Sequence, residues 1–227
     1  MVSFGVLGPV LAGGAGPASP KARTLLAVLL MHGPTPVPVE RLLDELWRDD
    51  PPAGGVRSMH VHVSRLRRHL RAAGVETRLH TRPGSYELRV GPGELDAERF
   101  RSTATAAAAR FGRSDLAGAE ALATLALRQW RGPALADVAS PSIDRVYRPA
   151  LEELRLSVHE LRFACWIGLG RPAAVVEPIA ELSAEHPLRE RLTGQLMIAL
   201  TLAGRDRDAL VEYERLRTRL RRELGTE

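Results

Sequence analysis

Residues 56–71 read VRSMHVHVSRLRRHLR and decide how the rest of the chain is interpreted. Apolar side chains recur in this stretch at helical spacing, which predicts a helix from about Val56 to Ala73. The side chains that this helix would bury are Met59, Val63, Leu66 and Leu70. The same stretch holds five arginines, three histidines and no acidic residue. Its opposite face is therefore basic, which favours a helix that enters the major groove of DNA over the alternative of a merely solvated basic helix.

The surrounding residues predict a small domain around this helix. A short apolar strand covers Val2 to Val10, and helices begin near Pro20 and Val39. After the basic helix, two strand-like runs flank Pro83-Gly84-Ser85, which is typical of a hairpin. Three helices followed by a hairpin outline a winged helix-turn-helix domain. We expect it to occupy residues 1–93.

Residues 94–227 show no strand pattern and predict an all-α domain. Expected helices cover about 96–111, 115–130, 143–169, 172–185, 188–203 and 206–224. Gly170-Arg171 and Gly204-Arg205 lie 34 residues apart, which is the period of tetratricopeptide repeats. At that offset Val176 matches Leu210 and Ile179 matches Tyr213. A generic helical bundle is the alternative. The expected fold class is mostly α with a small β component.

Charge is distributed unevenly between these two parts. The chain has 32 basic and 27 acidic residues, and residues 1–93 hold 12 basic against 7 acidic, whereas residues 94–227 hold 20 of each. This asymmetry favours a polyanionic partner for the first part. We therefore expect residues 1–93 to bind DNA on their own. The lone cysteine, Cys165, excludes an internal disulfide framework, and the absence of a long apolar run favours a cytoplasmic protein.

Sequence motifs for catalysis are absent. Gly13, Gly14 and Gly16 lack the Gly-Lys-Ser/Thr ending of a phosphate-binding loop, and no nucleophile elbow or HExxH motif occurs. His60 and His62 stand two residues apart on a predicted helix and therefore point to different faces. We expect no enzyme activity, no metal and no cofactor.

Several motifs resemble known families. Residues 61–68 (VHVSRLRR) resemble the recognition helix of OmpR/PhoB-type winged helices, and residues 82–86 (RPGSY) resemble their wing. Residues 130–137, 151–156 and 186–192 resemble the bacterial transcriptional activation domain. This order of domains resembles the Streptomyces antibiotic regulatory protein family.

The resemblance implies an activator of a secondary-metabolite gene cluster in an actinomycete. Such a protein would bind direct repeats near a promoter as two side-by-side protomers and contact RNA polymerase and its sigma factor. By position, the residues facing bases would be Ser58, Val61 and Arg65. Those facing phosphates would be Arg57, His62, Ser64 and Tyr86. Arg82 would enter the minor groove, with His60 and Arg68 as further contacts.

Some alternatives stay open. Tyr86 could pack on the core of the hairpin instead of facing phosphate. Residues 11–19 are shorter and richer in glycine than the N-terminal hairpin of the family, and relatives continue into at least one more helix beyond residue 227. The second interpretation of the whole chain is a helical-repeat scaffold that binds a peptide. In that case the basic helix is incidental.

Overall fold

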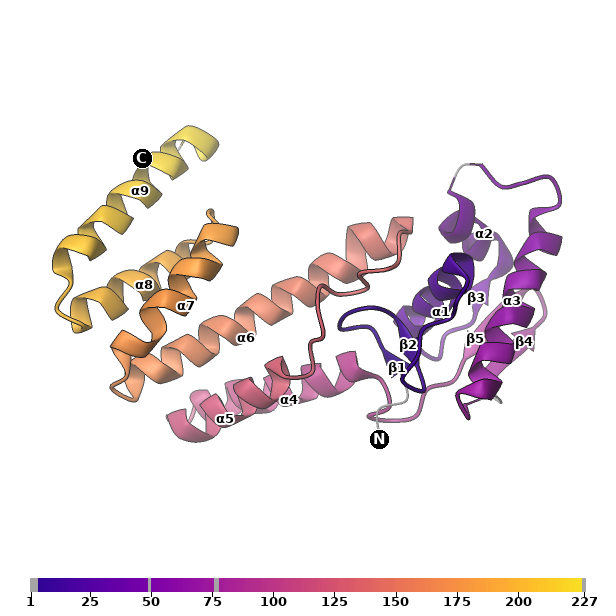
Figure 1. The fold of residues 1–227 in the computed structure, drawn as a ribbon, viewed down its shortest axis with the longest axis horizontal. Helices are drawn as coiled ribbons and strands as arrows, with labels where there is room; N and C mark the ends of the chain where they lie inside the picture. The colour runs from indigo at the N-terminus through magenta and orange to yellow at the C-terminus, as the bar shows by residue number, and fades with distance from the viewer. Residues whose placement is uncertain (1–3, 49, 76–77, 226–227) are drawn as a thin grey trace. The chain divides into compact units, whose positions relative to one another are not determined.

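The fold is taken from a computed structural model that describes residues 4–48, 50–75 and 78–225 (Figure 1). The chain forms two compact units. The winged unit combines residues 1–102 with residues 126–155, and the helical unit combines residues 103–125 with residues 156–227. Each unit is therefore built from two separate stretches of sequence.

Three helices form the centre of the winged unit: α1 (Pro20–His32), α2 (Val39–Trp47) and α3 (Gly55–Ala72). Pro20 begins α1, where its missing N–H costs nothing. The apolar stripe of α3 is buried as expected, because Met59, Val63, Leu66 and Leu70 are at most 2% exposed. They pack against α1, whose leucines are also buried. The opposite face of α3 is therefore left to solvent.

The strands of the winged unit form two small antiparallel sheets. β1 (Phe4–Gly5) pairs with β2 (Leu11–Ala12). The second sheet has the order β3–β5–β4, with β3 at Val37–Pro38, β4 at Leu79–Arg82 and β5 at Ser85–Leu88. Pro83 and Gly84 form the turn of the hairpin, and Gly84 adopts the left-handed conformation (φ 63°) that favours glycine. The sequence had predicted the hairpin but not the short strand β3.

Residues 131–137 are docked along residues 6–10 within the winged unit. The backbone N–H groups of Arg131 and Leu135 donate to the carbonyl oxygens of Leu7 and Val6 at 2.8 and 2.9 Å. Asp137 accepts a hydrogen bond from Val10 N–H at 2.8 Å. We call residues 131–137 the strap, since they tie a late part of the sequence onto its beginning.

Asp96 completes this attachment. Its buried carboxylate accepts hydrogen bonds from the N–H groups of Val6 (2.8 Å) and Leu7 (3.2 Å) and forms an ion pair with Arg131 at 3.1 Å. A Cβ on Gly5 would lie 2.5 Å from the Arg131 guanidinium, so a larger residue here would displace the end of that side chain. The fragment 1–93, which we expect to bind DNA alone, lacks Asp96 and the strap.

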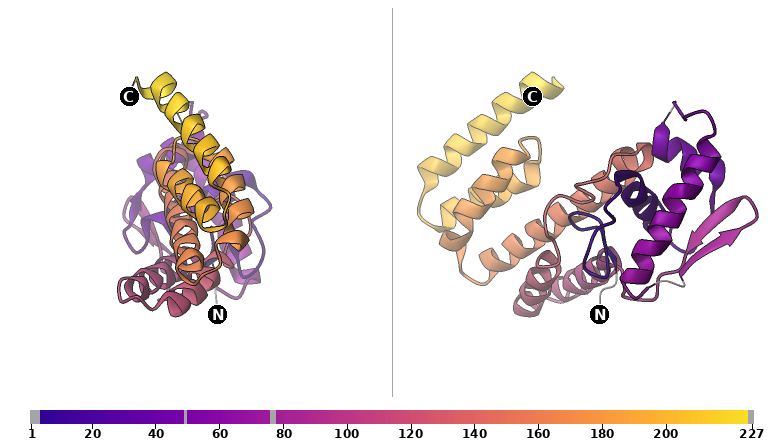
Figure 2. Two further views of the ribbon diagram at one scale, coloured as in Figure 1. Left: turned by 90° about the vertical axis from the view of Figure 1, so that its left-hand side faces the viewer. Right: turned by 45° about the vertical axis from the view of Figure 1, so that its right-hand side comes forward.

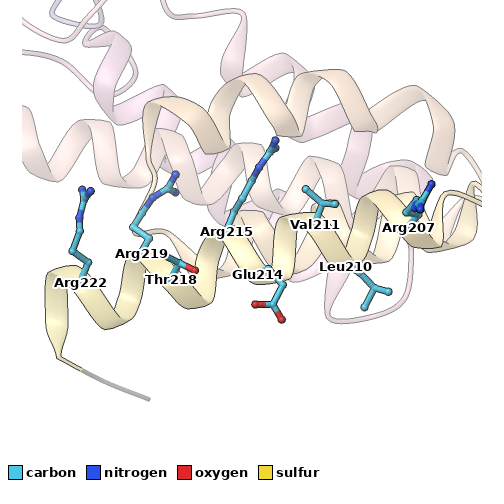
Figure 3. A pocket seen from close by; sticks show the side chains of 8 residues that line it. All are labelled: Arg207, Leu210, Val211, Glu214, Arg215, Thr218, Arg219 and Arg222. Carbon is cyan, nitrogen blue, oxygen red and sulfur yellow. The ribbon is translucent and has the colours of Figure 1, made fainter.

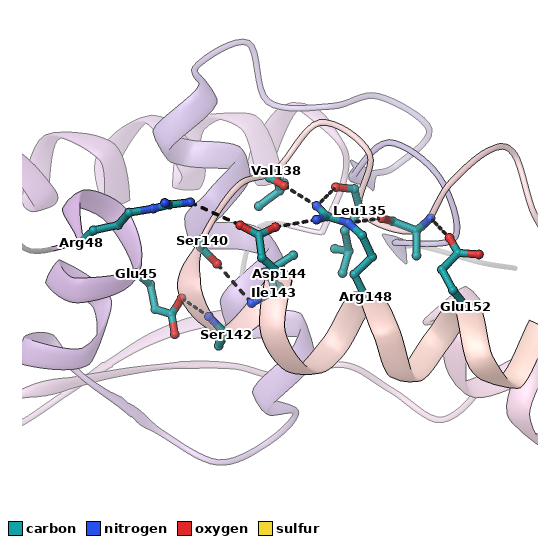
Figure 4. A network of polar contacts seen from close by, with 11 residues as sticks. Glu45, Arg48, Leu135, Val138, Ser140, Ser142, Ile143, Asp144, Arg148 and Glu152 are labelled. Atoms are coloured by element: carbon teal, nitrogen blue, oxygen red, sulfur yellow. Dashed lines mark hydrogen bonds and ion pairs between the residues drawn. The ribbon is translucent and has the colours of Figure 1, made fainter. Parts of the chain in front are cut away.

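A second polar network fixes the stretch that follows the strap (Figure 4). Arg148 donates to the carbonyl oxygens of Leu135 (3.0 Å) and Val138 (2.6 Å) and pairs with Asp144 at 2.5 Å. Asp144 also pairs with Arg48 beside α2 at 3.3 Å. Residues 135–148 are thereby bound to the winged unit, although they lie after the first helices of the predicted C-terminal domain.

The remaining elements are helical. They are α4 (Asp96–Phe111), α5 (Leu116–Leu127), a π-helical turn (Ile143–Tyr147), α6 (Arg148–Gly168), α7 (Pro172–Glu185), α8 (Glu190–Leu202) and α9 (Asp206–Leu224). In the helical unit α8 packs against both α7 and α9 (Figure 2). The predicted helix over 143–169 is thus a π-helical turn that continues into α6.

The 34-residue offset appears in the structure, because α7 begins at residue 172 and α9 at residue 206. Equivalent positions nevertheless differ in exposure. Val176 and Ile179 are buried against α8, whereas Leu210 is 65% and Tyr213 44% exposed. The matching side of α9 therefore has no helix packed on it within the part of the chain that the structure describes. None of the helices in those residues has the length and hydrophobicity that a membrane span requires.

We expect Asp96→Asn to lower the free energy of unfolding by about 2–3 kcal/mol, because hydrogen bonds to a buried charged group are lost. Urea unfolding of the full chain measures the change. The matched control is Asp208→Asn, which neutralises an ion pair with Arg205 that is about half exposed and should cost under about 1 kcal/mol. Equal effects of the two substitutions would contradict the structural role of Asp96.

Candidate nucleic-acid interface

The outer face of α3 presents six side chains to solvent. They are Arg57, His60, Val61, Ser64, Arg65 and Arg68. Within the described residues, no carboxylate or carbonyl pairs with Arg57, Arg65 or Arg68. Val61 is 47% exposed among these polar groups. The face thus combines unpaired guanidinium donors with a small apolar contact, which are the groups that read guanine edges and thymine methyls.

Arg67 behaves differently from its neighbours on α3. Its guanidinium donates to Thr81 Oγ1 of β4 at 2.7 Å and lies 3.5 Å from the Leu79 carbonyl oxygen. This contact joins the basic helix to the hairpin, which extends beside α3 in the right-hand view of Figure 2. In the sequence Arg67 is one member of the basic run, and only the structure shows its contact with the hairpin.

His62 lies on the flank of α3 and faces α1 and α2. Its Nδ1 is 3.5 Å from Ser19 Oγ, and its ring centroid is 6.0 Å from that of Trp47. Burial, together with the neighbouring charges of Arg65 and Lys21, lowers the pKa of His62 below its ordinary value. The imidazole is therefore neutral at pH 7 and can offer one hydrogen bond but no charge. Ser58, in the first turn, is half-buried.

The hairpin brings together three charged side chains. Glu87 on β5 accepts hydrogen bonds from Arg82 Nε at 2.9 Å and from Arg89 Nε at 2.7 Å. These guanidiniums, Arg89 first, hold the pKa of the Glu87 carboxyl below its ordinary value. Arg82 therefore differs from Arg57, Arg65 and Arg68 of α3, because it already has a carboxylate partner.

Tyr86 is 6% exposed and sits on the central strand, paired with Val37 and Thr81. The ring of Tyr86 is therefore buried in the core, which is one of the two alternatives that the sequence leaves open. A contact with phosphate would fall to its hydroxyl group alone.

An open surface with a volume of about 700 Å³ lies against α9, and all the residues that line it, Leu210 and Val211 among them, belong to that helix (Figure 3). Two arginines of this surface are engaged: Arg215 pairs with Glu212 at 2.5 Å, and Arg219 donates to the Pro187 carbonyl oxygen at 2.8 Å. Arg207 is exposed, and no carboxylate or carbonyl pairs with it among the described residues. Arginines with and without such acceptors therefore occur on both α9 and α3.

The described residues offer little for catalysis. No group of three or more His, Cys, Asp or Glu side chains could hold a metal ion among them. Burial raises the pKa of the Cys165 thiol to about 11, so it stays protonated at neutral pH and is a poor nucleophile.

The low pKa of His62 predicts a pH dependence of stability. A proton binds more tightly to this imidazole in the unfolded chain, where its pKa is about 6.5, so protonation favours unfolding. The stability that His62 contributes is complete above about pH 6.5 and is lost as the pH falls below it. Thermal melts of His62→Gln should therefore show a shallower decrease in Tm from about pH 7 to about pH 5 than the unmodified chain. Identical slopes would contradict this environment for His62.

Two family models match the chain. Residues 14–85 match the model described as "Transcriptional regulatory protein, C terminal". Residues 95–227 match the "Bacterial transcriptional activator domain". The first match covers α1 to the start of β5, and the second covers α4 to α9.

Relatives and a solved structure agree with these matches. The transcriptional regulatory protein EmbR of Mycobacterium tuberculosis is 37% identical over 99% of this chain, which spans 59% of EmbR. Regulatory protein DnrI of Streptomyces peucetius is 34% identical over 100% of this chain and 87% of its own length. A structure of M. tuberculosis EmbR with a low-affinity phosphopeptide aligns with a TM-score of 0.91, at 34% identity, over 100% of this chain and 61% of that one. The chain belongs to the Streptomyces antibiotic regulatory protein family of transcriptional regulators, in which an OmpR/PhoB-type winged helix precedes a helical activator domain.

Proposed function

We propose that the protein is a sequence-specific DNA-binding transcriptional activator that reads the major groove with α3. One observation carries this proposal: the outer face of α3 exposes Arg57, Arg65 and Arg68 with no intramolecular partner among the described residues. Exposed guanidiniums on one face of a helix create a positive potential that attracts a polyanion. Duplex DNA supplies phosphates for such groups and base edges for a bidentate guanidinium.

The position of each residue on α3 decides whether we assign it to bases or to phosphates. Ser58, Val61 and Arg65 are spaced at three and four residues, so they share one face of the helix and are assigned to bases. Arg57 and Ser64 are assigned to phosphates, with His60 and Arg68 as additional contacts. His62 is neutral and half-buried, so its contribution to a phosphate contact would be a single hydrogen bond. Arg82 of the hairpin is assigned to the minor groove, and the Tyr86 hydroxyl to phosphate.

The helical unit is assigned to protein contacts. Large apolar side chains remain exposed on α8 and α9, including Ile198 (52%), Leu202 (59%) and Leu210 (65%). Exposed apolar groups of this kind suit a protein partner. In line with the family, this partner is RNA polymerase with its sigma factor, and two protomers would bind direct repeats side by side. The target promoters would belong to a secondary-metabolite gene cluster of an actinomycete. The protein itself would act in the cytoplasm.

The alternative of a peptide-binding scaffold rests on the open surface of α9. Its apolar lining supports a protein partner, but it leaves the unpaired basic face of α3 without a role. The activator proposal uses both surfaces.

We expect Arg65→Ala to weaken binding to a selected duplex by about 1–3 kcal/mol and to relax preference at one base pair, because a bidentate base contact is lost. Arg57→Ala should weaken selected and random duplexes about equally and reduce the slope of log K against log salt by about 0.9. Fluorescence anisotropy at several salt concentrations measures both variants. If both changed selected and random duplexes alike, the assignment of faces on α3 would be wrong.

We expect Leu210→Glu to leave DNA affinity unchanged and to reduce activated transcription, because it places a charge on the exposed apolar surface of α9. In-vitro transcription with an actinobacterial RNA polymerase, run beside anisotropy, separates the two effects. Val146→Glu is the matched control, since Val146 is also exposed (57%) but lies in the winged unit. Full activation by Leu210→Glu would exclude this part of α9 from the polymerase contact.

A further inference from the structure

Glu87 occupies an unexpected position for a chain that binds DNA. It is an acid at the base of a hairpin assigned to the minor groove, and its side chain is only 8% exposed. The register of the sheet explains how it meets two arginines. Arg82 lies directly opposite Ser85 on the neighbouring strand. Ser85, Glu87 and Arg89 are two residues apart, so their side chains lie on the same face of the sheet as that of Arg82. The three charged side chains therefore converge on the same face.

The contacts of Glu87 divide its carboxylate between the two arginines. Arg82 reaches Oε2 through both Nε (2.9 Å) and Nη2 (2.8 Å). Arg89 reaches Oε1 through Nε at 2.7 Å. A guanidinium has five N–H donors, so this engagement fixes the plane of Arg82 while leaving other donors available. Both arginine side chains remain about half exposed, at 44% and 57%.

We propose that Glu87 is a positioning residue that sets the DNA specificity of the hairpin by holding the Arg82 guanidinium in a fixed orientation. The inference rests on the proposed function and deepens it. An arginine without a partner at this position would be free to bind any nearby phosphate, and phosphate contacts carry no sequence information. A guanidinium held by a carboxylate responds instead to the width and potential of the minor groove, which depend on sequence. Glu87 also removes one unit of positive charge from the hairpin and thus weakens binding to random DNA.

The test uses the full chain, with a duplex selected by the unmodified protein from a randomised library and a random duplex of equal length. Glu87→Gln should raise affinity for the random duplex roughly threefold at low salt and steepen the salt slope by up to about 0.9, as one further phosphate contact forms. The affinity of this variant for the selected duplex, divided by its affinity for the random duplex, should fall. We call this quotient the specificity ratio. Glu87→Asp keeps the charge but withdraws the carboxylate by one methylene. It should lower the same ratio without changing the salt slope.

Two further variants separate positioning from general charge. In an Arg82→Ala background, Glu87→Gln should no longer change the specificity ratio, since its effect requires that arginine. Glu94→Gln is the matched control. It removes the negative charge that pairs with Arg78, at another place in the winged unit. It should leave the ratio unchanged. Thermal melts check that each variant is folded.

The outcomes are distinct. The inference is overturned if Glu87→Gln and Glu87→Asp both keep the ratio of the unmodified protein, or if Glu87→Gln acts equally with and without Arg82. If the unmodified chain selects no duplex over random DNA, the proposed function fails first and the inference fails with it.

Discussion

The attachment of the strap to residues 6–10 is the constraint on which the winged unit depends. Asp96 accepts hydrogen bonds from the N–H groups of Val6 and Leu7, which would otherwise be buried without partners, and Arg131 donates to the Pro9 carbonyl oxygen at 3.0 Å. Asp137 extends the attachment to α1 through its ion pair with Arg23 at 3.2 Å. Since α3 packs on α1, the position of the basic face follows from contacts made 60 to 80 residues later in the sequence. The position of the basic face of α3 thus depends in part on residues beyond residue 93.

Arginine supplies almost all of the positive charge, and its partners decide its role. Arg131 and Arg148 are bound to carbonyls and carboxylates and hold the chain together. Arg67 links α3 to the hairpin, and Arg82 is held by Glu87. Arg65 has no such acceptor among the described residues. A count of basic residues treats these groups alike, whereas the structure separates those that stabilise the fold from those available to a polyanion.

The sequence predicted the elements better than their connections. The apolar spacing of α3 identified its buried and exposed faces, and Pro20 marked the start of α1. Periodicity cannot indicate that residues 131–137 pair with residues 6–10, because that contact depends on chain topology. It also missed β3, which has only two residues. For the interface, the charged run pointed to α3, but the burial of Tyr86 and the pairing of Arg82 arise from the sheet register, which the motif alone does not contain.

Arginine-selective footprinting of the full chain with phenylglyoxal shows directly whether α3 meets DNA. The reagent modifies accessible guanidiniums, and mass spectrometry reports each site with and without a selected duplex. The account predicts that the duplex protects Arg57, Arg65 and Arg68, while Arg207 and Arg221, which are exposed on α9, keep their reactivity. Protection of the α9 arginines without protection of those on α3 would contradict the account and assign DNA binding to the helical unit.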